Sequence, residues 1–427
     1  MEIRPFRGWR FRGRSGDVSE HIAPPYDVLT AADKGRLLAR SEENVVAADM
    51  PHVPPNTLGP DAVYLAAAET LAKWKSSGVL VQDQSPAVYA YEQTFSWAGK
   101  RHTRRAIVCG VRATELGKDV IPHEHTFPGP KADRLRLTEF TRMQLSAIFG
   151  FYDDPRGRVV GAAFAGLCCP ETFGELDGVG ERMWAVKDEG VIAAVAEALR
   201  DVPVFIADGH HRYTTALAYR DQLRSAGQIG DDHEANFVMF ALVSRDDEGL
   251  MILPTHRIIR GLKAGFSLAG LRAACPGFEW RQFPISKADL SDADGFLRPL
   301  GENAMAFIAQ GGSEMWIARP ADSMVAPQVK ANGKDASVDL DVAILHDLVI
   351  GKAMAPWRTD GFTIDYTPRG EDVLHACRAA RAQLGVCLQS TPLATVQAVA
   401  LAGRFMPHKS TYFHPKLATG MVLKPLE

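Results

Sequence analysis

The chain has 427 residues, of which 46% are hydrophobic and 23% charged, and its formal net charge is −3. These values are typical of globular proteins and exclude wholesale disorder, and the length allows two or three domains. A net charge so close to zero gives no global electrostatic case for nucleic acid or an anionic membrane as a partner, although it is compatible with a local charged patch. Of the six cysteines, Cys168 and Cys169 are adjacent and the other four are scattered without CxxC spacing, which argues against a disulfide scaffold or a zinc knuckle.

The N-terminus is basic but no apolar stretch follows it, which argues against a signal peptide. No apolar run approaches the ~18 residues that a membrane span requires. We therefore expect a cytoplasmic protein that does not contact a membrane. The sequence has no internal repeat and does not indicate an oligomeric state.

Hydrophobic periodicity and turn residues predict an α+β fold with mixed sheets. We expect a first α+β region with a hairpin over 1–155, a central region over 156–330, and C-terminal helices with a polar tail over 331–427, packed back on the others. The elements predicted for the first region are helices over 31–40, 61–76 and 131–147, hairpin strands over 87–97 and 104–115, a polar loop over 121–126, and a strand over 148–152.

The central and C-terminal regions alternate predicted strands and helices. The predicted strands are 181–187, 202–207, 236–244, 250–253 and a pair near 303–318. The predicted helices are 190–200, 213–224, 338–350 and 371–384. Residues 393–402 fit either a strand or a helix, because their length does not distinguish the two.

The strongest chemical signal lies where the strand over 202–207 meets the next helix. Gly209 permits a tight turn with positive φ, and the helix N-terminus that follows offers free N–H groups and partial positive charge to an anion. Arg212 adds a bidentate donor for phosphate or carboxylate, and His210 and His211 are able to donate hydrogen bonds or exchange protons. Asp208 is suited to orienting a histidine, holding a metal or capping the helix. The alternative is a purely structural turn.

Other polar clusters are weaker candidates. His123, Glu124 and His125 fit an acid–base or substrate-contact role better than a metal site, because no HExxH spacing is present. Pro24 and Pro25 hold Tyr26 and Asp27 rigidly, although a simple turn also explains this pattern. Three further candidates for anion or substrate contacts are Arg257, Lys409 and Ser410. The full glycine spacing of a phosphate-binding loop is absent around Lys409 and Ser410, because His408 stands where the second glycine belongs. His346 fits a structural role.

The chain resembles a family catalogued as domain of unknown function 1015 over almost its whole length. The motifs that carry the resemblance are APPYDV (23–28), IPHEHT (121–126), ADRLRL (132–137), ADGHHRYTTAL (207–217), ILPTHR (252–257), DVAILH (341–346) and MPHKSTYFHPK (406–416). The strand–DGHHR–helix unit is also similar to the phosphate-binding corner of the ParB/sulfiredoxin-like superfamily. That superfamily includes nucleotide-binding proteins, sulfiredoxins and free-serine kinases.

The resemblance implies that Asp208, Gly209, His210, His211 and Arg212 cradle a nucleotide phosphate, with Tyr213 beside them. Histidine stands where sulfiredoxins carry their reactive cysteine, so sulfinic acid reduction is disfavoured. The function implied is phosphoryl transfer involving serine or O-phosphoserine, with a nucleotide or other donor and with Mg²⁺, for which Asp208 is a candidate ligand. No metal cage is visible in the sequence.

His210 or Glu124 is the expected proton-transfer group, with Asp208 also in the catalytic set. Tyr26, Asp27, His123, His125, Arg257, Lys409 and Ser410 are expected to contact the substrate. Two alternatives stay open, namely an O-phosphoserine phosphatase and a non-catalytic nucleotide-binding regulator. The absence of a helix-turn-helix signature and of a basic tail argues against DNA binding.

Overall fold

A computed structural model describes residues 1–55, 57–321, 340–407 and 409–427. His408 and the beginning of the helix predicted over 338–350 lie outside the described residues. The chain forms two compact units, one of Met1–Met251 with Pro415–Glu427 and the other of Ile252–His414. These boundaries differ from the positions 155 and 330 predicted from the sequence.

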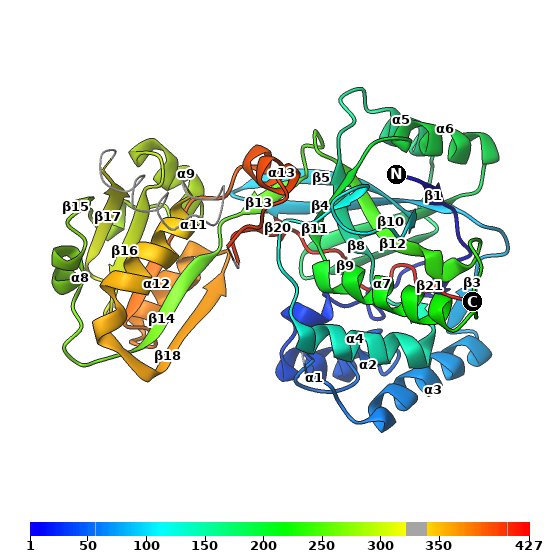
Figure 1. Ribbon diagram of the computed structural model, residues 1–427, viewed down its shortest axis with the longest axis horizontal. Helices are drawn as coiled ribbons and strands as arrows, with labels where there is room; N and C mark the ends of the chain where they lie inside the picture. The colour runs from blue at the N-terminus through cyan, green and yellow to red at the C-terminus, as the bar shows by residue number, and fades with distance from the viewer. Residues whose placement is uncertain (56, 322–339, 408) are drawn as a thin grey trace. The chain divides into compact units, whose positions relative to one another are not determined.

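The first unit is built on a mixed nine-stranded sheet (Figure 1). Its order is β6-β11-β8-β12-β5-β4-β10-β9, and β1 pairs with β5. The pairs β6–β11 and β8–β12 are parallel, and the other pairs are antiparallel. The strands are β1 (Ile3–Arg4), β4 (Val88–Trp97), β5 (Lys100–Arg112), β6 (Val120–Ile121), β8 (Ile148–Tyr152), β9 (Thr172–Leu176), β10 (Val179–Val186), β11 (Val204–Asp208) and β12 (Phe237–Ser244).

Helices cover one face of this sheet and enclose the core of the unit. Alternate residues of β4, β5, β8, β11 and β12 pack there against α5, α6 and α7, including Tyr213 of α7 and Phe240 of β12. The helices are η1 (Tyr26–Val28), α1 (Ala31–Arg40), α2 (Val46–Asp49), α3 (Asp61–Ser77), α4 (Pro128–Thr141), α5 (Arg158–Ala163), α6 (Glu189–Leu199), α7 (His210–Ser225) and η2 (Glu234–Asn236).

Two short strand pairs complete the first unit. β2 (Trp9–Phe11) pairs with β3 (Leu80–Gln82), and β7 (Met143–Gln144) pairs with β21 (Lys424–Pro425) near the C-terminus. The second pair ties the returning end of the chain to the segment that follows α4. The helix α4 lies beside α7 and α3 (Figure 1).

The second unit has an antiparallel six-stranded sheet of order β15-β17-β16-β19-β14-β18. Its strands are β14 (His256–Leu262), β15 (Phe278–Gln282), β16 (Met305–Ala309), β17 (Met315–Pro320), β18 (Arg358–Thr367) and β19 (Leu384–Cys387). The short strands β13 (Met251–Leu253) and β20 (Tyr412–His414) form a separate pair where the chain enters and leaves this unit. Its helices are α8 (Leu268–Ala274), η3 (Ile285–Lys287), α9 (Ala293–Leu297), η4 (Arg298–Leu300), α11 (Asp341–Ile344), the π-helix η5 (Leu345–Ala353), η6 (Ala355–Trp357), α12 (Gly370–Arg378) and α13 (Leu393–Leu401).

The predicted α+β class with mixed sheets is confirmed, and several elements match closely, such as α1 and β8. Two helix predictions are wrong at their C-terminal ends. The helix predicted to 147 ends at Thr141, because Arg142 adopts a left-handed φ of 49° and the next residues pair with β21. The helix predicted over 371–384 ends at Arg378, and Leu384 begins buried strand β19. Residues 393–401 are helical.

Candidate functional site

The Asp-Gly-His-His-Arg turn joins β11 directly to α7. Gly209 has φ 95°, a conformation that suits glycine, and its carbonyl oxygen accepts the first bond of the helix from the Tyr213 N–H at 3.0 Å. No side chain caps this 16-residue helix. The N–H groups of His210, His211 and Arg212 therefore lie in the first turn, where a helix offers unpaired donors and partial positive charge.

A parallel strand pair brings a second polar loop to this turn. Val204 and Phe205 of β11 stand in register with Val120 and Ile121 of β6, so the segments after both strands leave the same edge of the sheet. The backbone N–H of His123 donates to Nε2 of His210 at 3.2 Å, and the two rings meet edge to face at 4.7 Å. The two motifs are thus joined within the first unit.

Both of these histidines are buried and uncharged near neutral pH. Burial lowers the pKa of His123 to about 4, and burial together with the neighbouring His123 lowers the pKa of His210 well below its ordinary value. Because Nε2 of His210 accepts a hydrogen bond, its proton is placed on Nδ1. His210 is therefore a neutral donor through Nδ1.

The loop after β6 also contacts His211, which is half-buried. Nε2 of His211 accepts from the Phe127 N–H at 2.9 Å, and the two rings stack at 6.0 Å. The Phe127 side chain is itself 50% exposed. Between these anchored positions, Glu124 is half-buried and His125 is exposed. The Glu124 carboxylate is consequently carried on a loop that is fixed to the turn at both ends.

Asp208 holds two cations at the turn. Its carboxylate lies 3.1 Å from Nη2 of Arg212 and 3.3 Å from Nζ of Lys416. Burial opposes ionisation of Asp208, but Lys416 and Arg212 outweigh it and hold the pKa of the carboxyl well below its usual range. The Arg212 guanidinium also donates to the Ala147 carbonyl oxygen. Two cations, one carboxylate and a helix N-terminus together favour an anion.

Lys416 is positioned by a buried polar network on the sheet face opposite the helical core. Nη2 of Arg104 donates to the Pro415 carbonyl oxygen at 2.6 Å, and Nε2 of Gln93 donates to the Lys416 carbonyl oxygen at 3.1 Å. Glu181 accepts from Gln93 at 3.0 Å and from the Tyr91 hydroxyl at 2.5 Å. Burial raises the pKa of Glu181 to about 7 and lowers that of Arg104 to about 10.

A second cluster of charged side chains lies between Arg212 and the helices α2 and α4. The Arg134 guanidinium lies 2.7 Å from Asp133 and 3.5 Å from Asp49, and it covers the ring of Tyr26 at 4.0 Å. Asp133 is fully buried and also accepts from His52 and Tyr64, each at 2.7 Å. Burial lowers the pKa of the Arg212 guanidinium, but Asp208, and after it the exposed Asp27 and the buried Asp49, raise it, so the group stays protonated.

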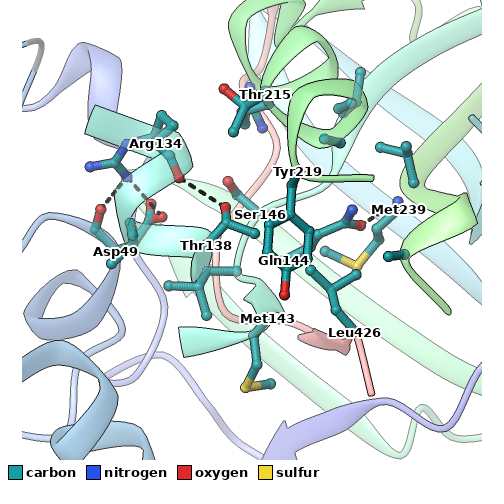
Figure 2. A pocket seen from close by; sticks show the side chains of 17 residues that line it. Asp49, Arg134, Thr138, Met143, Gln144, Ser146, Thr215, Tyr219, Met239 and Leu426 are labelled. Carbon is teal, nitrogen blue, oxygen red and sulfur yellow. Dashed lines mark hydrogen bonds and ion pairs between the residues drawn. The ribbon is translucent and has the colours of Figure 1, made fainter. Parts of the chain in front are cut away.

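A cavity opens beside this cluster, lined by residues of α2, α4, α7, β12 and the chain around β7 (Figure 2). Asp49, Arg134 and Arg212 supply its charged side chains. Met143, Val238, Met239 and Leu426 supply apolar surface. Figure 2 shows Asp49 and Arg134 on one side of the cavity and Met239 and Leu426 on the other. The cavity is therefore amphipathic, and it shares Arg212 with the turn.

The structure brings together most of the site residues that the sequence predicts and that lie in the first unit. Tyr213 is an exception, because it lies in the core and not at the turn. Its hydroxyl is bound to the Thr114 backbone, donating to the carbonyl oxygen at 2.6 Å and accepting from the N–H at 3.0 Å. The ring is fully buried and packs edge to face against Phe240. Tyr213 thus anchors α7 to the sheet.

The other predicted contacts belong to the second unit, where three of the sequence motifs meet. Arg257 is fully buried, and Nη2 donates to the Lys409 carbonyl oxygen at 3.1 Å while Nε donates to Nε2 of His346 at 3.2 Å. The Ser410 hydroxyl donates to the Pro407 carbonyl oxygen at 2.5 Å. Burial lowers the pKa of Arg257 to about 10. These contacts are internal to that unit.

Sequence reasoning missed Lys416, Arg134, Asp133 and Asp49. Lys416 is the last residue of the motif MPHKSTYFHPK, and Asp133 and Arg134 are the second and third residues of the motif ADRLRL. The adjacent Asp and Arg residues on one predicted helix could have indicated an ion pair. Asp49 follows three small or β-branched residues and gives no such signal.

No group of three or more His, Cys, Asp or Glu side chains in the described ranges has a metal-binding arrangement. Asp208 is already engaged by Arg212 and Lys416, so the described residues do not form a protein-built Mg²⁺ site. None of the helices in the described part of the chain combines the length and apolar character that a membrane crossing needs.

Residues 3–342 match the family described as protein of unknown function (DUF1015), and the chain belongs to this family. No curated protein sequence matches the chain.

Several solved structures show distant similarity. A free serine kinase in complex with AMP is 11% identical, with a TM-score of 0.32 over 70% of this chain and 89% of that one. SbnI with a C-terminal truncation, from Staphylococcus aureus, is 10% identical, with a TM-score of 0.36 over 75% and 87%. A conserved hypothetical protein from Pyrococcus furiosus is 13% identical, with a TM-score of 0.32 over 70% and 90%.

Proposed function

We propose that this protein is a phosphotransferase that acts on serine or O-phosphoserine and binds the phosphate of a nucleotide at the Asp208–Arg212 turn. One observation carries the proposal. Gly209 turns the chain so that the uncapped N-terminus of α7 lies beside Arg212 and Lys416, both held by Asp208. The likeness of this turn to the phosphate-cradling turn of free-serine kinases also supports phosphate binding here.

Phosphoryl transfer requires positioned cations and donors more than covalent chemistry. The N–H groups of the first turn of α7, Arg212 and Lys416 would stabilise negative charge on the phosphoryl oxygens. The Nδ1–H of neutral His210 and the ring of His211 add further polar contacts. Asp208 acts as a positioning residue, because its carboxylate is occupied by the two cations.

Glu124 is the proposed base. The serine hydroxyl oxygen forms a bond to the transferred phosphorus while the bond from phosphorus to the bridging oxygen of the donor breaks. That oxygen leaves with the electron pair, and the hydroxyl proton passes to Glu124. His210 is the poorer base, because it is buried, its pKa is strongly lowered and its Nε2 already accepts from His123. Mg²⁺ would arrive with the nucleotide phosphates, and no step depends on a protein-built metal site.

Phosphorus NMR of the full chain tests the proposal. The protein is incubated with serine, Mg²⁺ and ATP, ADP or pyrophosphate, and separately with O-phosphoserine alone or with AMP or ADP. Formation of O-phosphoserine, or nucleotide-dependent loss of its phosphate, is expected. Glu124→Gln is expected to lower kcat at least tenfold while the affinity for AMP stays unchanged.

Other results would change the assignment. Release of free phosphate from O-phosphoserine without nucleotide would make the protein a phosphatase that uses the same turn. Nucleotide binding without turnover of any phosphate ester would make it a ligand-binding regulator. A folded Arg212→Lys variant keeps the charge but loses the bidentate geometry. Unchanged AMP affinity in that variant would refute the role of the turn.

A further inference from the structure

We propose that the amphipathic cavity beside Arg212 is the nucleoside pocket of the phosphate site, with the base in its apolar part and the ribose near Asp49 and Thr215. This inference rests on the proposed function, since it takes the phosphate to lie at the N-terminus of α7. It adds the part of the protein that would distinguish a nucleotide from other phosphate esters.

The first argument is the order of side chains along α7. Arg212, Thr215 and Tyr219 are spaced by three and four residues, so they share one helix face, and all three line the cavity. Seven residues of helix span roughly 10 Å at 1.5 Å per residue. A phosphate at the start of α7 would therefore place a nucleoside along this face, with its base near Tyr219.

The second argument is the polar part of the cavity. The Thr215 hydroxyl is buried, with the residue 3% exposed, and it has no hydrogen-bond partner within the described structure. Buried polar groups are usually paired, so a ligand hydroxyl is a natural partner. Asp49 also lines this part, and carboxylates commonly bind ribose hydroxyls in nucleotide sites. Arg134 holds Asp49 at 3.5 Å and keeps it in place.

The third argument is the shape and chemistry of the apolar part. The cavity contains about 590 Å³ of space outside protein atoms, its mouth included. This apolar part, called the slot below, offers walls that suit the flat face of a base. Val238, Met239 and Leu426 supply the apolar walls.

An edge of this slot carries hydrogen-bonding groups suited to a base. Oε1 of Gln144 accepts from the Met239 N–H at 2.6 Å, and its NH₂ group has no acceptor among the described residues. That NH₂ group is available to a ring nitrogen or carbonyl. Free serine, with a single methylene group, would leave the apolar walls uncovered. The lining therefore favours a nucleoside over an amino acid.

Calorimetric titration of the full-length protein with AMP, ribose 5-phosphate and inorganic phosphate tests the inference. AMP is expected to bind at least tenfold more tightly than ribose 5-phosphate. Ser146 lies among the labelled lining residues in Figure 2, and Ser146→Phe should fill the slot. This variant is expected to lower AMP affinity to that of ribose 5-phosphate and to leave the latter unchanged.

A milder pair of variants keeps the test decisive if Ser146→Phe does not fold. Thr215→Val removes the unpartnered hydroxyl and should weaken AMP and ribose 5-phosphate about threefold without affecting inorganic phosphate. Thr214→Val is the matched control, because the Thr214 hydroxyl donates to the His211 carbonyl oxygen and Thr214 does not line the cavity. Its AMP affinity should equal that of the unmodified protein.

Three results would overturn the inference. Equal affinities for AMP and ribose 5-phosphate in the unmodified protein would show that the base has no pocket. An AMP affinity unchanged by both Ser146→Phe and Thr215→Val would place the nucleoside elsewhere, with the phosphate site intact if Arg212→Lys still weakens AMP. If Ser146→Phe or Thr215→Val loses serine binding and keeps AMP binding, the cavity belongs to the amino acid. Absence of binding by all three phosphate ligands would instead refute the proposed function itself.

Discussion

Replacing Gly209 with alanine perturbs the turn at its centre. Gly209 has φ 95°, and a Cβ atom added there would lie 3.0 Å from Cζ of Arg212. The guanidinium would have to move by a few tenths of an ångström, which alters its contacts with Asp208 and Ala147. Gly227 at the other end of α7 is a matched control, because it has φ 66° and nothing within 4 Å of the added Cβ.

The two variants are expected to lose similar stability but different affinity. Alanine at positive φ costs roughly 1–2 kcal/mol in either position. In a unit of this size, this corresponds to a fall in Tm of about 2–8 °C. A hydrogen bond to a charged group contributes about 1.5–3 kcal/mol. Displacement of Arg212 should therefore weaken AMP binding at least tenfold in Gly209→Ala and leave Gly227→Ala unaffected.

Calorimetric titration with AMP, with thermal unfolding of the same samples, measures both quantities. An AMP affinity of Gly209→Ala equal to that of Gly227→Ala would refute the reasoning. It would mean that the placement of Arg212 over Gly209 does not matter for the ligand.

Three further predictions concern the charges around the turn. Lys416→Met should weaken AMP binding about tenfold, whereas Lys118→Met, at an exposed site, should have no effect in the same titration. Asp133→Ala leaves Arg134 buried without its closest carboxylate and should lower the free energy of unfolding by about 3–5 kcal/mol. Asp61→Ala, which breaks an exposed ion pair, should cost less than about 1 kcal/mol in the same urea titration, and equal losses would contradict the burial argument. Because burial lowers the pKa of His123 to about 4, the unfolded chain binds more protons between pH 6.5 and 4, so stability should fall as the pH drops through this range. His123→Gln should remove about 3 kcal/mol of that fall, and an unchanged pH profile would show that His123 is accessible to protons.

Elements with strong local patterns were predictable from the sequence, whereas those set by distant partners were not. The capping residues Thr30 and Asp33 and the apolar run of β8 act locally, and both elements match their predicted bounds. The segment after Thr141 has helical composition, but it pairs with Lys424 and Pro425 at the far end of the chain. Long-range pairing of this kind overrides local propensity.

The candidate site shows the same division. The five adjacent residues from Asp208 to Arg212 made the turn predictable, because residues of these types at a strand–helix junction are suited to anion binding. The approach of His123 depends on the parallel pairing of β6, which is only two residues long and gives no periodic signal. Within one motif the sequence favoured Lys409 and Ser410, yet Lys416 is the residue that pairs with Asp208. The chain passes from the second unit to the first between His414 and Pro415, and composition does not reveal that change.

The return of the chain to the first unit also sets an order of events during synthesis. Residues 415–427 leave the ribosome only after the whole of Ile252–His414 has been made. Until then the first unit has β11, the turn and α7, but it lacks Lys416 and strand β21. A nascent chain therefore carries Asp208 and Arg212 without the second cation, and it gains that cation only after the residues of the second unit have been made. Completion of the anion site is in this way coupled to completion of the second unit.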